Sequence, residues 1–311
     1  MRKSCGSRYY PWMDAQGRYT IVGLGEVVWD LHPDGPRLGG APANVAYHAT
    51  TLGDRGVVAS RVGADARGGL ARAELESRGV DVALLQVDEA RPTGTVAVQL
   101  GPSGEVVFRV AEDAAWWNPA WSGEWEALLE QADALCFGTL LQASAPGREL
   151  LRRAAAAVPP RCLRLLDLNL RQPHDGDAVV APALAQATAL KLSEEELGVL
   201  ATRRGCTEPE LLATLLDEHG LQLVAITRGA RGSSLVAPGR RLEHPGCPAD
   251  GGGDPVGAGD AFTAALVHHL LRGHALERAH AAASRYASFV AGRRGAMPVV
   301  PESVVREVVG A

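Results

Sequence analysis

The segment of the sequence that most clearly could do chemistry is a run of glycines that leads directly into an apolar, alanine-rich stretch. It reads Gly251-Gly-Gly-Asp-Pro-Val-Gly-Ala-Gly-Asp260 and continues as Ala261-Phe262. Glycines allow backbone N–H groups to crowd around a ligand, and the first turn of a following helix adds unpaired N–H groups and a partial positive charge. The segment therefore predicts an anion-binding site.

Asp260 stands in the first turn of this expected helix, where its carboxylate would repel a bound phosphate unless it had a function of its own. One such function is to accept the proton of an attacking hydroxyl group. The alternative is that Asp260 caps the helix and that the glycines only form a turn, since Asp is a favoured capping residue. Taken alone, the segment leaves both interpretations open.

The elements that must position these residues alternate between strands and helices. The expected strands cover residues 19–25, 56–62, 134–137, 163–168, 189–192 and 221–227. The expected helices include residues 45–52, 65–78 and 261–292, the last one interrupted at Gly273. This pattern predicts an α/β fold: a doubly wound, mostly parallel sheet with helices on both faces and a site at the carboxyl ends of the strands.

A hairpin interrupts this alternation and predicts a small β-sheet lid. Two strands, 95–100 and 106–110, flank the turn residues Gly101-Pro-Ser-Gly104, and we expect residues 26–39 to join them in a lid built from 26–39 and 93–110. Apolar residues alternate along both strands, so one face of the ribbon is apolar: Val96, Val98, Leu100, Val106, Phe108 and Val110. We expect two chains to pair through these faces as a homodimer; the alternative is a monomer whose lid folds over its own cleft.

Two glycine motifs in this order resemble those of the ribokinase-like (PfkB) family of carbohydrate kinases. They are Gly39-Gly-Ala-Pro-Ala-Asn44 and Asp254-Pro-Val-Gly-Ala-Gly-Asp260, and the resemblance spans about residues 20–301. It implies that Asp260 is the catalytic base and that the amides of Gly257, Ala258 and Gly259 stabilise the transferring phosphoryl group. It also implies ATP and Mg²⁺ as cofactors and a small-molecule sugar as the acceptor.

Other stretches agree with this resemblance on the sugar side. Asp30, Gly40 and Asn44 match the family's sugar-contacting positions, although Asp30 alone could be a turn residue. Asp167-Leu-Asn-Leu-Arg171 resembles the family's DxNxR strand end, which implies that Asn169 and Arg171 lie near substrate and phosphate; a salt-bridged strand end is the alternative. Arg109, on the second lid strand, is the candidate to reach the sugar, unless it is an exposed strand arginine.

On the nucleotide side, Lys191-Leu-Ser-Glu-Glu-Glu196 resembles the family's NxxE element, with Ser193 in place of Asn. The resemblance implies that Glu196 orients the water shell of Mg²⁺, while Ser193 followed by three acids would also begin a helix. The turn within residues 226–233 resembles the one that holds the nucleotide. Its candidate contacts are Thr227, Gly229 and Gly232.

One position departs from the family pattern, because Pro255 stands where relatives usually carry Thr. In the family this loop often binds a monovalent cation through Asp and backbone carbonyls, so Asp254 is the candidate ligand for K⁺. Proline lacks an N–H group but keeps its carbonyl, so the implied cation site is weakened rather than lost.

Composition excludes several other classes of protein. The chain has 311 residues and a net charge of -5, which argues against a general nucleic-acid or anionic-membrane surface. No apolar run is long enough to span a bilayer. The five cysteines form no CxxC pair and fit a reducing cytoplasm. We expect residues 1–18 to be an N-terminal extension and residues 19–311 to form the kinase domain.

The sequence therefore predicts an ATP-dependent sugar kinase that transfers the γ-phosphoryl group to a sugar hydroxymethyl group, most similar to fructokinases. A ribokinase or nucleoside kinase on the same fold is the first alternative. A catalytically silent scaffold of this fold, which binds a sugar or partners, is the second. A hydride-transferring Rossmann enzyme is disfavoured, because no GxGxxG motif follows the first strand.

Overall fold

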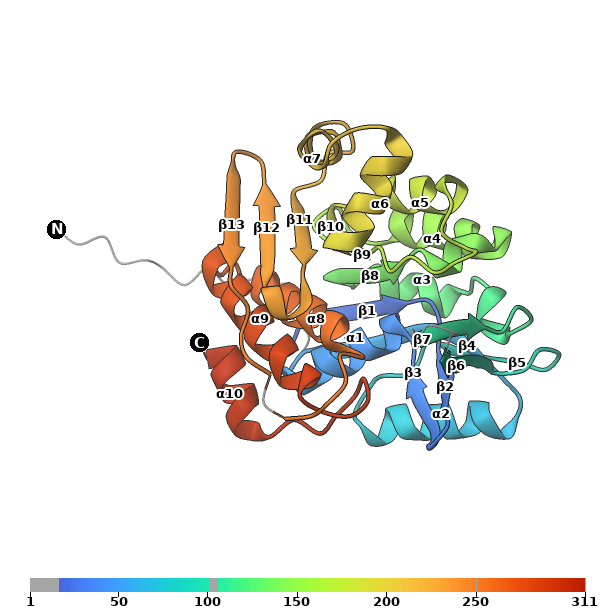
Figure 1. Cartoon of the computed structure of the whole chain (residues 1–311). Coiled ribbons are helices and arrows are strands. Elements are labelled where there is room, and N and C mark those ends of the chain that lie inside the picture. The colour runs from blue at the N-terminus through green and yellow to red at the C-terminus, as the bar shows by residue number, and fades with distance from the viewer. Residues whose placement is uncertain (1–16, 101–105, 250, 311) are drawn as a thin grey trace.

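The computed structural model describes residues 17–100, 106–249 and 251–310 and is built around a nine-stranded sheet (Figure 1). The strand order is β13-β12-β11-β10-β9-β8-β1-β4-β5. The strands that pair in parallel are β1 (Thr20–Leu24), β4 (Arg55–Gly63), β5 (Leu85–Asp88), β8 (Ala134–Gly138), β9 (Leu163–Asp167), β10 (Ala189–Ser193) and β11 (Leu223–Thr227). The predicted mostly parallel sheet is confirmed.

An antiparallel hairpin of β12 (Ser233–Ala237) and β13 (Arg240–His244) extends one edge of this sheet. Neither strand is predicted by the sequence pattern. The outer strand, Arg240-Arg-Leu-Glu-His244, is polar and largely exposed, so it lacks the apolar pattern that marks the central strands. Polar residues are typical of an edge strand, which needs only one neighbour to pair its backbone.

Helices cover both faces of the sheet (Figure 1). One face carries α1 (Ala41–Thr51), α2 (Ala66–Ser77), α8 (Ala258–Leu271), α9 (Leu276–Ala291) and α10 (Glu302–Gly310). The other carries α3 (Gly123–Leu129), α4 (Ala145–Ala157), α5 (Asp177–Leu184), α6 (Glu194–Arg204) and α7 (Glu208–Asp217). Side chains alternate along β1, so Ile21 packs with the first set of helices while Val22 and Leu24 pack with the second. No helix in the described residues is long and apolar enough to cross a bilayer.

The lid is a separate four-stranded sheet in the order β3-β2-β6-β7. Its strands are β2 (Val28–His32), β3 (Gly35–Gly39), β6 (Gly94–Leu100) and β7 (Val106–Val110). β2 pairs antiparallel with β3 and parallel with β6, and Val96 of β6 lies opposite Val110 of β7. The predicted lid is confirmed, whereas the turn at 101–105 and nearly all of the extension predicted at 1–18 lie outside the described residues.

Candidate functional site

A cavity of about 320 Å³ lies where the carboxyl ends of β1 and β9 meet the lid and the first turns of α1 and α8. Residues from distant parts of the chain line it because the carboxyl ends of parallel strands share one edge of the sheet. Many of the predicted site residues are among them: Asp30, Gly40, Asn44, Asn169, Arg171, Gly257, Gly259 and Asp260. Asp30 and Asp260 therefore face one space, as the predicted mechanism requires.

The glycine run forms a tight turn at the start of α8. Gly257 is the residue that precedes the helix, with φ of +79°, and a Cβ atom there would lie 2.5 Å from Cα of Ala296. Only glycine fits this left-handed and crowded position. The helix therefore begins beside the cavity, and no side chain caps the N–H groups of its first turn.

Asp260 projects from the first turn of α8 into the cavity. Its Oδ2 atom accepts a hydrogen bond of 2.7 Å from Nδ2 of Asn44, which lies in the first turn of α1. Gly257, not Asp260, occupies the capping position, so the interpretation of Asp260 as a cap is wrong. Removal from water raises the pKa of the Asp260 carboxyl to about 7, and the Asp167 carboxylate adds to this effect. A carboxyl with this pKa can accept a proton near neutral pH.

Two further carboxyl groups line the cavity on the lid side. Burial raises the pKa of Asp30, on β2, to about 6, although Arg171 and Arg37 act in the opposite direction. Burial raises the pKa of Glu26, which follows β1, to about 7, and its Oε1 accepts a hydrogen bond of 3.1 Å from the amide of Ala41. Glu26 thereby fixes the start of α1, a role that the sequence analysis did not assign to it.

Lys191 and Asp167 form a buried ion pair in the cavity wall. Nζ of Lys191 lies 3.0 Å from both carboxylate oxygens of Asp167, and the two residues are paired in the register of β10 with β9. Burial disfavours the charged ammonium, but the carboxylates of Asp167, Asp260 and Glu196 outweigh it and raise the pKa of Lys191. Both residues lie within the motifs at 167–171 and 191–196, but neither was among the predicted site residues.

Arg109 lies outside the cavity, which corrects its prediction as a sugar contact. Val96 and Val110 line the cavity from the lid, whereas Arg109 is exposed. Successive side chains of a strand point to opposite faces, so the residue before Val110 points away from the cavity. The alternative interpretation, an exposed strand arginine, describes its position.

Glu196 lies beside the cavity rather than in its lining. Its Oε2 accepts a hydrogen bond of 2.8 Å from the amide of Ser193, and the Ser193 hydroxyl accepts one from the amide of Glu196, so the expected helix start is confirmed. Its Oε1 accepts a hydrogen bond of 2.7 Å from the amide of Leu170, within the DxNxR stretch. Glu196 thus ties α6 to the end of β9.

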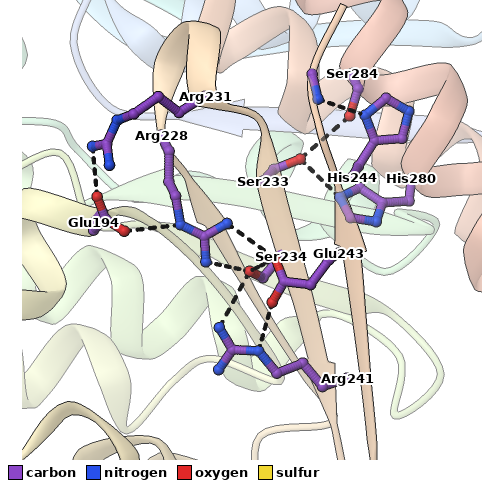
Figure 2. Close-up of polar contacts among 11 residues, drawn as sticks. Glu194, Arg228, Arg231, Ser233, Ser234, Arg241, Glu243, His244, His280 and Ser284 are labelled. Atoms are coloured by element: carbon purple, nitrogen blue, oxygen red, sulfur yellow. Dashed lines mark hydrogen bonds and ion pairs between the residues drawn. The ribbon is translucent and has the colours of Figure 1, made fainter.

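The turn after β11 is held against α6 by ion pairs (Figure 2). Nε of Arg228 lies 2.9 Å from Glu194, and Nη1 of the same side chain lies 3.1 Å from Glu243 on β13. Arg231 also pairs with Glu194, at 2.6 Å. Arg228 and Arg231 thereby hold this turn to the start of α6, and the predicted nucleotide residues belong to the same turn: Thr227, Gly229 and Gly232.

Comparison with known proteins settles the family. Residues 15–303 match the model of the pfkB family of carbohydrate kinases. The chain belongs to this family. It is 33% identical to a fructokinase of Klebsiella pneumoniae over 265 residues, which cover 79% of this chain and 83% of that protein. The predicted family and enzyme class are confirmed.

Solved structures agree with this membership in the PfkB family. An uncharacterized sugar kinase of Pyrococcus horikoshii is 27% identical and covers 93% of this chain and 99% of its own, with a TM-score of 0.80 alone and 0.75 in complex with ATP. A fructokinase of Vibrio cholerae with bound fructose, ADP and calcium ion is 25% identical, covers 94% of this chain and 99% of its own, and has a TM-score of 0.75.

The loop before α8 carries Asp254 and Pro255. Oδ1 of Asp254 accepts a hydrogen bond of 3.1 Å from the amide of Val256, and Oδ2 accepts one of 3.4 Å from the amide of Gly295. The carbonyl of Pro255 accepts a hydrogen bond of 3.2 Å from the amide of Ala258. Within the described residues, no cluster of three or more His, Cys, Asp or Glu side chains could hold a metal ion.

Proposed function

We propose that this PfkB kinase phosphorylates the hydroxymethyl group of fructose or a closely similar neutral sugar. The observation that carries the proposal is the single cavity in which Asp260, the first turn of α8 and Asp30 face one another. The cavity volume of about 320 Å³ suits one small sugar beside a phosphate group. We choose fructose among neutral sugars because the similar proteins include fructokinases, one of them solved with bound fructose.

In the proposed reaction, the sugar lies between the lid and α1. The carboxylate of Asp30 accepts hydrogen bonds from sugar hydroxyl groups, Asn44, Gly40 and Asn169 contact the sugar, and Arg171 lies toward the phosphate. Asn44 supports this role, since its Oδ1 is buried beside the cavity without a partner among the described residues and can accept from a hydroxyl group.

The chemical step uses the first turn of α8. Asp260 accepts the proton of the attacking hydroxyl, whose oxygen bonds to the γ-phosphorus of ATP. The bond from this phosphorus to the bridging oxygen breaks, and its electron pair leaves with ADP. The amides of Gly257, Ala258 and Gly259 stabilise the charge on the transferring group. Asp260 is well placed for this because Asn44 fixes its orientation.

Magnesium fits this site as an ion carried by the nucleotide. Mg²⁺ commonly keeps several waters and binds few protein carboxylates together with substrate phosphates. Glu196 suits such a role, because each of its oxygens accepts one backbone N–H group and retains capacity to accept from a metal-bound water. Bound Mg²⁺ would neutralise phosphate charge. Asp254 and the Pro255 carbonyl remain our proposed ligands for K⁺.

We also propose a cytoplasmic homodimer that pairs through the lid. Val96 and Val110 line the chain's own cavity, so this end of the apolar face serves the cleft beneath it. Pairing between chains would therefore use the far end of the ribbon, where Val98 lies opposite Phe108 in the strand register. A monomer whose lid serves only its own cleft is the alternative to this dimer.

Release of ADP, measured by a coupled assay, tests the proposed function. Fructose, ribose, ketodeoxygluconate and adenosine are compared as acceptors with ATP and Mg²⁺. We expect the highest kcat/KM with fructose. If ribose or adenosine gives a higher kcat/KM, that compound replaces fructose as the proposed acceptor. If sugar and nucleotide bind but no acceptor is turned over, the result supports the silent scaffold.

A further inference from the structure

Lysine is rare in this chain, and one of its few lysines lies in the cavity. Of the 31 basic residues, only Lys3 and Lys191 are lysines, and the others are arginines. The chain therefore uses arginine almost everywhere that a positive charge is required. Lys191 is 9% exposed and lines the cavity with Asp260 and Gly259. An ammonium group at this position is an exception that calls for a local reason.

The surroundings of Lys191 favour a compact cation over a guanidinium group. A Cβ atom on Gly259 would lie 2.8 Å from Nζ of Lys191, so the ammonium lies directly against the first turn of α8. Arginine presents a planar fork of five N–H donors, which requires more room and a planar acceptor. Lysine places a point charge with three N–H donors in the available space.

Asp167 holds this ammonium but leaves it able to bind an anion. Its two oxygens, each 3.0 Å from Nζ, account for two of the three N–H donors. Asp167 also accepts a longer hydrogen bond, of 3.4 Å, from the hydroxyl of Thr263 on α8, which fixes the carboxylate in turn. Asp167 leaves the third ammonium donor unused, and Lys191 lines the same cavity as Gly257 and Gly259 at the start of α8, where no side chain caps the helix.

We propose that Lys191 is a further catalytic residue, whose ammonium contacts the phosphoryl group during its transfer, and that Asp167 is the positioning residue that holds it. This inference rests on the proposed function. Lys191 remains protonated throughout, while the hydroxyl proton goes to Asp260 and the electron pair of the broken bond leaves with ADP. The ammonium stabilises the negative charge that develops on the phosphoryl oxygens in the transition state.

A simpler role for Lys191 is to neutralise Asp167 and hold β9 to β10. The two roles differ in what a substitution changes. Loss of a structural ion pair lowers stability and disturbs binding of both substrates, whereas loss of a transition-state contact lowers kcat with little effect on KM. The kinetic split therefore separates them.

The first experiment compares Lys191→Met and Lys191→Arg with the wild-type enzyme. We expect kcat to fall by about 100-fold to 1,000-fold in both variants, the usual effect of removing one such electrostatic contact, with the KM for sugar within about threefold. The control is Arg272→Met, since Arg272 forms an ion pair of 2.7 Å with the buried Asp54. This control should lower the melting temperature and leave kcat unchanged. A kcat within threefold of wild type for either Lys191 variant would overturn the proposal.

The second experiment uses the wild-type chain, so it stands even if the variants fail to fold. Lysine labelled with ¹³C at Cε gives signals from only two residues, which Lys3→Arg assigns. We expect the β,γ-methylene analogue of ATP, added with Mg²⁺ and fructose, to shift the Lys191 signal, and fructose alone to leave it unchanged. In Asp167→Asn, the free enzyme's Lys191 signal should move toward that of a mobile lysine.

The outcomes separate this inference from the proposed function. If calorimetry detects nucleotide binding and the enzyme turns over fructose, but the Lys191 signal does not respond to the analogue, Lys191 has no contact with the phosphates and the inference is wrong. If neither nucleotide binding nor turnover is observed with any acceptor, the proposed function itself fails. An unchanged Lys191 signal in Asp167→Asn would remove the positioning role of Asp167 alone.

Discussion

Replacement of Asp260 by Asn is the most direct test of the catalytic site. The side chain keeps its size, and its amide oxygen can still accept the hydrogen bond that Nδ2 of Asn44 donates at 2.7 Å. What is lost is the carboxylate that accepts the hydroxyl proton. General base catalysis contributes about 100-fold to 10,000-fold, so we expect kcat to fall within that range while the KM values for sugar and ATP change less than about threefold.

The pH dependence of the wild-type enzyme gives the same prediction a second measurement. Because removal from water raises the pKa of Asp260 to about 7, only about a tenth of the carboxyl is ionised one pH unit below this value and about nine tenths one unit above. The ionised form is the base and this pKa belongs to the free enzyme, so kcat/KM should rise roughly tenfold between pH 6 and pH 8. Asp260→Asn should lack this rise in the residual rate.

Stability provides the control for this variant. A carboxyl whose pKa is raised in the folded state binds its proton more tightly there than in the unfolded chain, so its contribution to stability falls as pH rises from about 4 to about 7. Asn has no such titration. The melting temperature of Asp260→Asn at pH 8 should therefore equal or exceed that of the wild type. Steady-state kinetics and calorimetry check both points, and unchanged turnover in a folded variant would refute the role of Asp260 as base.

Three further predictions concern the parts that surround the catalytic residues. Gly257→Ala introduces a Cβ atom 2.5 Å from Cα of Ala296 at a φ of +79°, so it should destabilise the fold by about 1–3 kcal/mol and lower kcat. The control is Gly69→Ala, which places its Cβ atom in open space on α2 and should change neither stability nor kcat in this way. Denaturant unfolding and kinetics of the pair decide this. Arg228→Met breaks the contact with Glu194, so it should raise the KM for ATP several-fold and leave the KM for fructose unchanged; equal effects on both would contradict a nucleotide role for this turn. Val98→Lys with Phe108→Lys should convert a light-scattering mass of two chains into one, and a single-chain mass already in the wild type would exclude the lid dimer.

Sequence alone was sufficient for those parts of the site that lie close together along the chain. The run from Asp254 to Asp260 specified both the glycine turn and the acid in the helix that follows, because the glycine conformations and the helix start are properties of neighbouring residues. The capping sequence from Ser193 to Glu196 was predictable for the same reason. The buried strands were equally clear, since each carries its own apolar pattern.

Contacts between distant segments were decided only by the tertiary structure. Lys191 and Asp167 form an ion pair because β9 and β10 are neighbours in register, although the two residues are 24 positions apart in the sequence. Arg109 was predicted to reach the sugar. Val96 and Val110 face the cavity, and because side chains alternate along a strand, the exposed Arg109 points away from it. The raised pKa of Asp260 likewise depends on burial and on Asp167, 93 positions earlier in the numbering of the chain. Local sequence patterns therefore determined which side chains and amides this protein has for chemistry. Packing determined which of these groups lie close together, because short distances between remote residues and exclusion of water arise only when the sheet and its helices are assembled.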